Sequence, residues 1–291
     1  MRARLIAIIV LIGLTCWACS NAIEAITHTN SGLDLLGGGE YEKAVDEFSA
    51  AIDIDPEFTN AYTQRAIAFH KQGKLDEALA DFDKAVELSP DDSNIFYHRG
   101  LAYIDKKLPD KALADLDKAI ELKAIYPEYF ITRGDVHKAG GDFEKAVSDY
   151  SKAIELDERN IGFYNIRAQL YLDNSKYDEA IADYTKIMSI DENDVQAVLD
   201  RGVAHIAKED YEHALIDLDK ALEMDAVNTA AMFHKAEVLE KTGKPEQALE
   251  QYKACLEAAD ADLKEKTQQR IATLELRLNP PEPPAEEAAE I

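Results

Sequence analysis

Small and large apolar residues recur along this chain with a period of 34 residues, from Ala25 to Asp262, without an insertion or deletion. Position 20 of every 34-residue repeat is alanine, position 8 is glycine or alanine, and position 24 is phenylalanine, tyrosine or leucine. Positions 4, 7, 8 and 11 follow one helical stripe, and positions 17, 20, 24, 27 and 28 follow another. Small residues let two helices approach and bulky ones fill the remaining space, so the pattern predicts seven helical hairpins.

The break between the two stripes, at positions 13 to 16, carries turn residues. Gly73, Gly141 and Gly243 fall in it, and Pro109 and Pro245 follow at position 17, where proline suits the first turn of a helix. The predicted repeats cover residues 25–58, 59–92, 93–126, 127–160, 161–194, 195–228 and 229–262.

A 34-residue helix-turn-helix repeat with this residue set resembles the tetratricopeptide repeat (TPR), and the resemblance covers 238 of the 291 residues. It implies an all-α fold, a right-handed α-solenoid of seven helix-turn-helix TPR units. Residues 263–278 place Leu263, Ile271 and Leu274 on one helical face, which predicts a C-terminal capping helix over the end of the array. Residues 279–291 are rich in proline and glutamate with few apolar residues, so a disordered tail is expected.

The first nineteen residues have the features of an export signal. Two arginines precede an apolar run from Leu5 to Ala18, which is shorter than the roughly 20 residues that a transmembrane helix needs. Cys19 follows a small residue at the end of the run, so residues 1–19 resemble a bacterial lipoprotein signal and Cys19 is a candidate for lipidation. Simple cleavage near Ser20 and an uncleaved anchor are the alternatives. In each case we expect the repeats in the periplasm, either free or attached to the membrane as a lipoprotein.

The net charge limits the classes of partner, and the number of cysteines limits the kinds of site that the repeats can contain. The sequence has 32 Lys and Arg against 57 Asp and Glu, a formal net charge of −25, and such acidity repels nucleic-acid phosphates and anionic lipids. Cysteine occurs only three times, twice within the first nineteen residues, so the repeats contain neither a disulfide framework nor a Cys-rich metal site.

The sequence shows no motif typical of catalysis or metal binding. His137 and His205 occupy position 11, where the other repeats have Leu, Phe or Tyr, so packing accounts for them, and the remaining histidines lack a metal-ligand spacing. The glycine runs lack the residues that complete a phosphate-binding loop. Cys255 stands where five other repeats have alanine and is interpreted as a small buried residue. We therefore expect no catalytic residue, no metal site and no cofactor.

Opposite charges recur at positions 7 and 23. Position 7 is arginine and position 23 is aspartate in repeats two to six, while the first repeat has Glu47 at position 23 and the last has Lys235 at position 7. If position 23 pairs with position 7 of the next repeat, all six pairs have opposite charge and the leftover residues, Ser31 and Gln251, are neutral. The predicted inter-repeat ion ladder is Glu47–Arg65, Asp81–Arg99, Asp115–Arg133, Asp149–Arg167, Asp183–Arg201 and Asp217–Lys235. A solvated acidic face is the alternative.

The family resemblance also implies where a partner would bind. In TPR proteins the first helices of the repeats line a concave surface through positions 2, 5, 9 and 12, and co-chaperone members grip a terminal carboxylate there with Lys, Arg and Asn. Position 5 has no lysine in this chain, and the middle and later groove positions are apolar, which typically marks a partner site. The predicted groove residues are Tyr97, Leu101, Ile104, Ile131, Leu172, Leu199, Val203, Ile206 and Phe233. Packing of some of them against a neighbouring helix is the alternative.

Together these features predict a non-enzymatic scaffold that is exported to the bacterial cell envelope and binds a protein or peptide segment in the concave TPR groove. Two alternatives stay open. One is an accessory subunit of an envelope enzyme or secretion complex, and the other is a cytosolic co-chaperone whose N-terminus is misread as a signal. No nucleic-acid partner is expected, and the membrane is expected as a partner only through an N-terminal lipid or an uncleaved signal.

Overall fold

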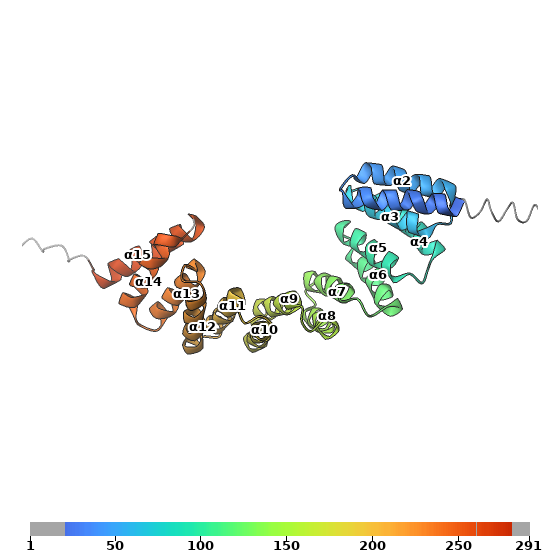
Figure 1. Cartoon of the computed structure of the whole chain (residues 1–291). Helices are drawn as coiled ribbons and strands as arrows, with labels where there is room; N and C mark the ends of the chain where they lie inside the picture. Colours follow the sequence, from blue (N-terminus) through green and yellow to red (C-terminus); the bar gives the residue numbers. More distant parts are fainter. Residues whose placement is uncertain (1–20, 260, 281–291) are drawn as a thin grey trace, which may run out of the picture. The chain divides into compact units, whose positions relative to one another are not determined.

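Helices form every regular element of the described chain. The structure, a computed structural model, describes residues 21–259 and 261–280 (Figure 1). The all-helical repeat fold predicted from the sequence is confirmed, and the chain divides into two compact units, Met1–Leu156 and Asp157–Ile291. The predicted signal at residues 1–19 with Cys19, and residues 281–291 of the predicted tail, lie outside the described residues. Within the described part of the chain, no helix is long and apolar enough to cross a membrane.

Each repeat consists of two helices that contact each other and are joined by a short turn. The N-terminal unit comprises a helix over residues 21–37, α2 (Tyr41–Ile54), α3 (Thr59–Lys71), α4 (Leu75–Leu88), α5 (Ser93–Asp105), α6 (Pro109–Leu122), α7 (Pro127–Ala139) and α8 (Phe143–Leu156). The C-terminal unit comprises α9 (Ile161–Asp173), α10 (Tyr177–Ile190), α11 (Val195–Ala207), α12 (Tyr211–Met224), α13 (Thr229–Lys241), α14 (Pro245–Ala258) and α15 (Ala261–Leu278). Pro109 and Pro245 begin α6 and α14, where the missing N–H costs no helical hydrogen bond.

The turn inside every repeat has the same backbone shape. Position 15 has a positive φ in all seven repeats, with glycine in four of them and Lys107, Ser175 and Glu209 in the others, at φ of 62°, 58° and 64°. In repeat six the N–H of Glu209 bonds to the Ile206 carbonyl and the N–H of Asp210 bonds to the His205 carbonyl, both at 2.9 Å. These bonds satisfy carbonyls that the end of α11 leaves free and fix how the next helix begins.

The core of each hairpin explains the alternation of small and large residues. A Cβ atom at Gly134 would lie 2.6 Å from the ring of Tyr150, and one at Gly32 would lie 2.5 Å from the ring of Phe48. The ring at position 24 thus occupies the space left by the small residue at position 8. Alanine at position 20 is fully buried in all seven repeats, as Ala146 is in repeat four, so it sets how closely the two helices approach.

The last helix covers the end of the array. Ile271 and Leu274 of α15 pack with Phe233 and Tyr252 of repeat seven in one buried cluster. Since α15 directly follows repeat seven, it takes the place that the first helix of a next repeat would have and removes this apolar surface from water.

Arginine at position 7 binds aspartate at position 23 of its own repeat. In repeats two to six each guanidinium donates two hydrogen bonds to the two carboxylate oxygens, at 2.6 to 3.0 Å. The pairs are Arg65–Asp81, Arg99–Asp115, Arg133–Asp149, Arg167–Asp183 and Arg201–Asp217. These aspartates are buried, which makes the pairs part of the hairpin interior.

The pairing predicted from the sequence, between position 23 and position 7 of the next repeat, is therefore wrong. Positions 23 and 25 lie on different sides of the second helix, and it is position 25 that meets the next repeat. Arg99 donates to Asp83 at 2.7 Å, and Lys235 pairs with Asp219 at 2.7 Å. At the N-terminal end, Glu47 pairs with His28 of its own repeat at 2.7 Å.

Candidate functional site

An apolar hollow of about 650 Å³ lies in the N-terminal unit, where repeat three meets repeat four. Leu101 and Ile104 of α5, Pro109 of α6, and Val136 and Ala139 of α7 supply most of its lining. The helices α5, α6 and α7 that carry these residues are labelled in Figure 1. Two of the predicted groove residues, Leu101 and Ile104, thus lie in a hollow with room for apolar side chains of another molecule.

Charged side chains span the equivalent junction between repeats two and three. His70 at position 12 contacts the Asp105 carboxylate of the next repeat at 2.7 Å, through Nε2. Lys106, at position 14, bonds to Asp76 of the preceding repeat. The first contact joins α3 to α5, and the second joins the C-terminal end of α5 to the start of α4.

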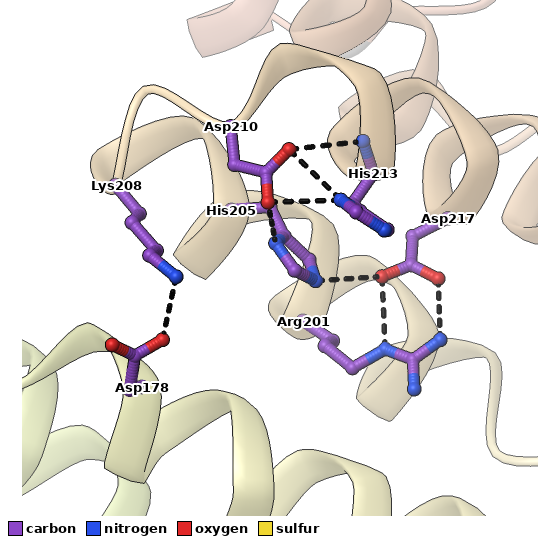
Figure 2. Close-up of polar contacts among 7 residues, drawn as sticks. All are labelled: Asp178, Arg201, His205, Lys208, Asp210, His213 and Asp217. Carbon is purple, nitrogen blue, oxygen red and sulfur yellow. Dashed lines mark hydrogen bonds and ion pairs between the residues drawn. The ribbon is translucent and has the colours of Figure 1, made fainter.

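The junction between repeats three and four lacks both contacts. The positions of Asp105 and Lys106 are occupied there by Ala139 and Gly140, and the position of His70 is occupied by Ile104. Position 14 is again a lysine in repeat six, where Lys208 Nζ bonds to Asp178 of the preceding repeat at 2.7 Å (Figure 2). The hollow is open because two small residues stand where neighbouring repeats have long or charged side chains.

The polar groups at the hollow carry one charge of each sign. Lys107 lies in the turn of repeat three and Asp135 lies on α7. The Tyr150 hydroxyl donates a hydrogen bond to Asp135 at 2.6 Å. Burial, together with this bond, raises the pKa of Tyr150, so the hydroxyl stays protonated and holds the carboxylate in place. An ammonium and a fixed carboxylate can orient the backbone or the ends of a bound peptide.

Tyr97, one turn before Leu101 on α5, is half-buried and held by neighbouring groups. Its ring stacks on Tyr129 with centroids 4.7 Å apart, and its hydroxyl accepts a hydrogen bond from Thr132 at 3.4 Å. Thr132 also lines the hollow. Tyr97 therefore contacts a lining residue of the hollow, Thr132, but is not itself part of the lining.

Two predicted groove residues of the C-terminal unit are core residues. Phe233 is 1% exposed because α15 covers it, and Lys266 of that helix places its ammonium 4.5 Å from the ring centroid. Leu199 is 4% exposed, and the partly buried Val203 and Ile206 pack against the same cluster. The prediction that all of these form a solvent-facing wall is wrong, because α13 packs against the cluster of Leu199 and α15 covers Phe233.

The remaining predicted groove residues, Ile131 of α7 and Leu172 of α9, are half-buried. Cys255 is fully buried, as the alanines at its position in other repeats suggested. Its Sγ lies 3.8 Å from the Thr267 hydroxyl of α15, and burial raises the pKa of its thiol. The thiol is thus protonated and packed, in agreement with its interpretation as a small core residue.

The structure also brings together histidines that the sequence analysis treated separately. His205 and His213 lie with their ring centroids 5.2 Å apart on either side of the turn in repeat six, and both face Asp210 (Figure 2). Sequence reasoning missed this group because its members belong to two helices and the turn between them. The repeat register contains the signal, since positions 11, 16 and 19 lie at the end of the first helix, at the turn and at the start of the second helix.

Comparison with known proteins identifies the repeats along most of the chain. A family model described as TPR repeat matches residues 32–73, 68–107 and 134–175. Two models described as tetratricopeptide repeat match residues 93–126 and 161–194, and residues 199–262. No curated protein matches the sequence.

Solved structures with the same architecture support this result. The crystal structure of YrrB, described as a TPR protein with an unusual peptide-binding site, is 26% identical, with 65% of this chain and 97% of that chain covered and a TM-score of 0.54. The C-terminal part of a TPR repeat-containing protein from Cytophaga hutchinsonii is 18% identical, with 84% and 99% covered and a TM-score of 0.73. MamA is 24% identical, with 59% and 93% covered and a TM-score of 0.52. The last two similarities concern the fold alone.

Proposed function

Because the chain belongs to the tetratricopeptide repeat family, we propose that it is a non-enzymatic scaffold that binds a segment of another protein in the apolar hollow of repeats three and four. Members of this family bind protein or peptide partners. The observation that carries the proposal is the hollow itself, about 650 Å³ and lined largely by Leu101, Ile104, Val136 and Ala139.

The lining defines the kind of segment that fits. An apolar side chain of the partner fills the hollow and loses contact with water, which is the main source of binding energy at such sites. Lys107 and Asp135 at the hollow fix the direction of the peptide through its polar groups. The similarity to YrrB, which is described as having a peptide-binding site, supports this class of ligand. The net charge of −25 favours a partner that is neutral or basic.

We propose further that the scaffold acts outside the cytoplasm. This part rests on the charged and apolar pattern of residues 1–19 and on Cys19. Mass spectrometry of the mature N-terminus tests it. A diacylglyceryl group on Cys19, and loss of membrane fractionation in Cys19→Ala, are expected, and an intact cytosolic N-terminus would contradict the proposal.

The binding site is tested with peptides selected by the full chain from a random display library. Leu101→Asp should weaken binding of a selected peptide by at least about tenfold, because a carboxylate then has to be buried with the ligand. Ile125→Asp is the matched control, since Ile125 is an apolar residue of the same unit that is 61% exposed and lies outside the hollow. Equal binding by Leu101→Asp and Ile125→Asp would place the site elsewhere.

A second variant closes the hollow while keeping its apolar side chains, since the residue that changes is the lining glycine Gly140. Gly140 has the same backbone conformation as Lys106 and Lys208 at this position, with φ of −79°, −75° and −78°. A Cβ atom at Gly140 meets only ordinary contacts, at 3.5 Å. Gly140→Lys should therefore fold normally, restore a lysine at the junction and reduce peptide binding. Unchanged binding together with an unchanged circular dichroism spectrum would argue against this hollow.

A further inference from the structure

Three side chains with metal-ligating atoms meet at the turn of repeat six. His205 lies in the last turn of α11, Asp210 is the N-cap of α12, and His213 lies in the first turn of α12 (Figure 2). Both oxygens of Asp210 lie 2.9 Å from His213 Nδ1, and Asp210 Oδ2 lies 3.4 Å from His205 Nδ1. The three candidate ligand atoms all lie within 4.8 Å of one another.

We propose that this trio binds a divalent transition-metal ion of the zinc type through His205 Nδ1, an Asp210 oxygen and His213 Nδ1. Ligands at the usual zinc bond lengths in a tetrahedral site are separated by about 3.3 Å. With Asp210 Oδ2 as the ligand, the separations of 2.9 and 3.4 Å lie on either side of this value, and the two histidine nitrogens lie within 4.8 Å of each other, so side-chain rotations have to bring the three atoms to the ion. The ion would take the place of the contact between His213 Nδ1 and the Asp210 carboxylate.

His205 supplies independent evidence for a ligand. Its Nδ1 atom is buried and has no hydrogen-bond partner, although the Asp210 carboxylate is 3.4 Å away. A buried nitrogen without a partner carries a desolvation cost that a bound ion would remove. The opposite ring nitrogen, Nε2, lies 3.9 Å from Asp217, which Arg201 holds with two hydrogen bonds (Figure 2). This separation is longer than a hydrogen bond, so Asp217 contributes a negative charge near the ring of His205 and does not fix the ring through a hydrogen bond.

The charges around the trio are compatible with a cation. The positive end of the α12 dipole opposes a cation, but the Asp210 carboxylate at the same helix end offsets it. Lys208, two residues before Asp210, is bonded to Asp178 at 2.7 Å and is thereby held away from the trio (Figure 2). The side chain of His213 is 61% exposed, which leaves an open path for the ion and for water ligands.

Repeat four provides an internal comparison. It has His137 and Asp142 at the same positions as His205 and Asp210, but Lys145 replaces the second histidine. The Lys145 ammonium bonds to Asp142 at 2.7 Å and so occupies the place of the ion with a fixed positive charge. Repeat six is the one repeat of the sequence that has histidine, aspartate and histidine at positions 11, 16 and 19.

The donor set determines the class of ion. Two imidazole nitrogens and one carboxylate suit zinc and its neighbours in the first transition row. Magnesium and calcium prefer sites made only of oxygen atoms. With three protein ligands, water completes the coordination, and the bound ion would clamp the turn between α11 and α12.

The test is a titration of the full chain, prepared without an added histidine tag and stripped with a chelator. Isothermal titration with zinc chloride should show one saturable equivalent, and the melting temperature should rise with zinc by mass action, whereas magnesium chloride should have no effect. His213→Lys, which copies repeat four, should weaken zinc binding by more than about 100-fold, since the loss of an outer-shell partner alone costs 10- to 100-fold.

The reciprocal variant creates the site a second time. Lys145→His should add a second zinc equivalent, because it completes the trio in repeat four. Since His213 is exposed and the same turn accepts lysine in repeat four, His213→Lys should keep its circular dichroism spectrum. Equal zinc binding by the wild-type chain and a folded His213→Lys variant would overturn the proposal, as would an equal response to magnesium.

Discussion

The guanidinium of Arg133 contacts two carboxylates in very different surroundings, and this makes it the best test of how the repeats are held together. It donates two hydrogen bonds to Asp149 of its own repeat, at 3.0 and 2.6 Å, and one to Asp117 of the preceding repeat, at 2.6 Å. The side chain of Asp149 is 5% exposed, whereas that of Asp117 is 62% exposed. The two contacts should therefore differ several-fold in energy although their lengths are similar.

The expected magnitudes follow from burial. Arg133→Met keeps most of the side-chain volume but leaves the Asp149 carboxylate buried without a partner, which should cost about 3 kcal/mol of unfolding free energy. Asp117→Asn removes an exposed acceptor and should cost less than about 1 kcal/mol. The double variant Arg133→Met/Asp149→Leu leaves no isolated charge and should regain at least about half of the loss, because apolar replacement of a buried pair is often neutral.

Urea denaturation followed by circular dichroism gives these energies, and hydrogen exchange of α7 and α8 locates the effect. A double-mutant cycle between Arg133 and Asp149 should give a coupling energy above about 1 kcal/mol. Arg167, which binds Asp183, serves as the control, and its coupling to Asp149 should stay below about 0.5 kcal/mol. Coupling of Asp149 to Arg167 in place of Arg133 would refute the pairing within repeats.

Three further predictions concern single residues. Phe233→Ala should cost about 3–5 kcal/mol and loosen α15, seen as lower melting temperature and faster exchange of α15, because the ring is fully buried. Lys107→Gly should stabilise the chain by about 0.5–1 kcal/mol in urea denaturation, because φ at this position is 62°. Burial, with the charges of His70 and Lys71, lowers the pKa of His98 to about 4, so stability should fall as the pH drops from 6.5 toward 4 while the unfolded chain takes up the proton. His98→Gln should remove this loss, which reaches at most about 2 kcal/mol at pH 5, and equal pH profiles would contradict the assignment.

The helix boundaries inside the repeats could be derived from the sequence because the repeat has one register, whereas α15 begins at Ala261, two residues before the predicted start of the capping helix at residue 263. Second helices begin at position 17 throughout, as Pro109 and Pro245 indicated, and first helices from repeat two onward begin at position 1, as Ser93 does. Local signals and packing agree at these positions, since a turn with positive φ always stands at position 15. A pattern repeated seven times leaves little freedom for a different set of helices.

The charge pairing could not be derived in the same way. Aspartate at position 23 is compatible with arginine in its own repeat and in the next one, and only the direction of the side chain on the helix decides. The neutral ends, Ser31 and Gln251, favoured the wrong frame. At the two ends of the array, Glu47 pairs with His28 and Lys235 pairs with Asp219. Neither partner stands at position 7 or 23, so the charge pattern at these positions does not show the two pairs.

Only some of the predicted groove residues line a hollow in the structure, and the reason is related. The register places Leu101, Leu199 and Phe233 on one kind of helix face, but the neighbour differs from repeat to repeat. Phe233 is covered because a capping helix follows, whereas Leu101 lines a hollow because Ala139 and Gly140 are small. Burial of a position in a repeat protein thus depends on residues of the next helix, which the position itself does not encode.

Both proposed sites arise at positions where packing leaves the side chain free to vary. Positions 8, 20 and 24 are restricted by the close approach of two helices, and a change there affects the fold. Positions 11 to 19 surround a turn whose backbone is the same in every repeat. A substitution there changes the chemical groups around the turn and leaves its backbone conformation the same. Gly140 in place of lysine opens an apolar hollow, and His213 in place of lysine completes a trio of metal ligands. The constant turn explains how repeats of one design can present different binding sites.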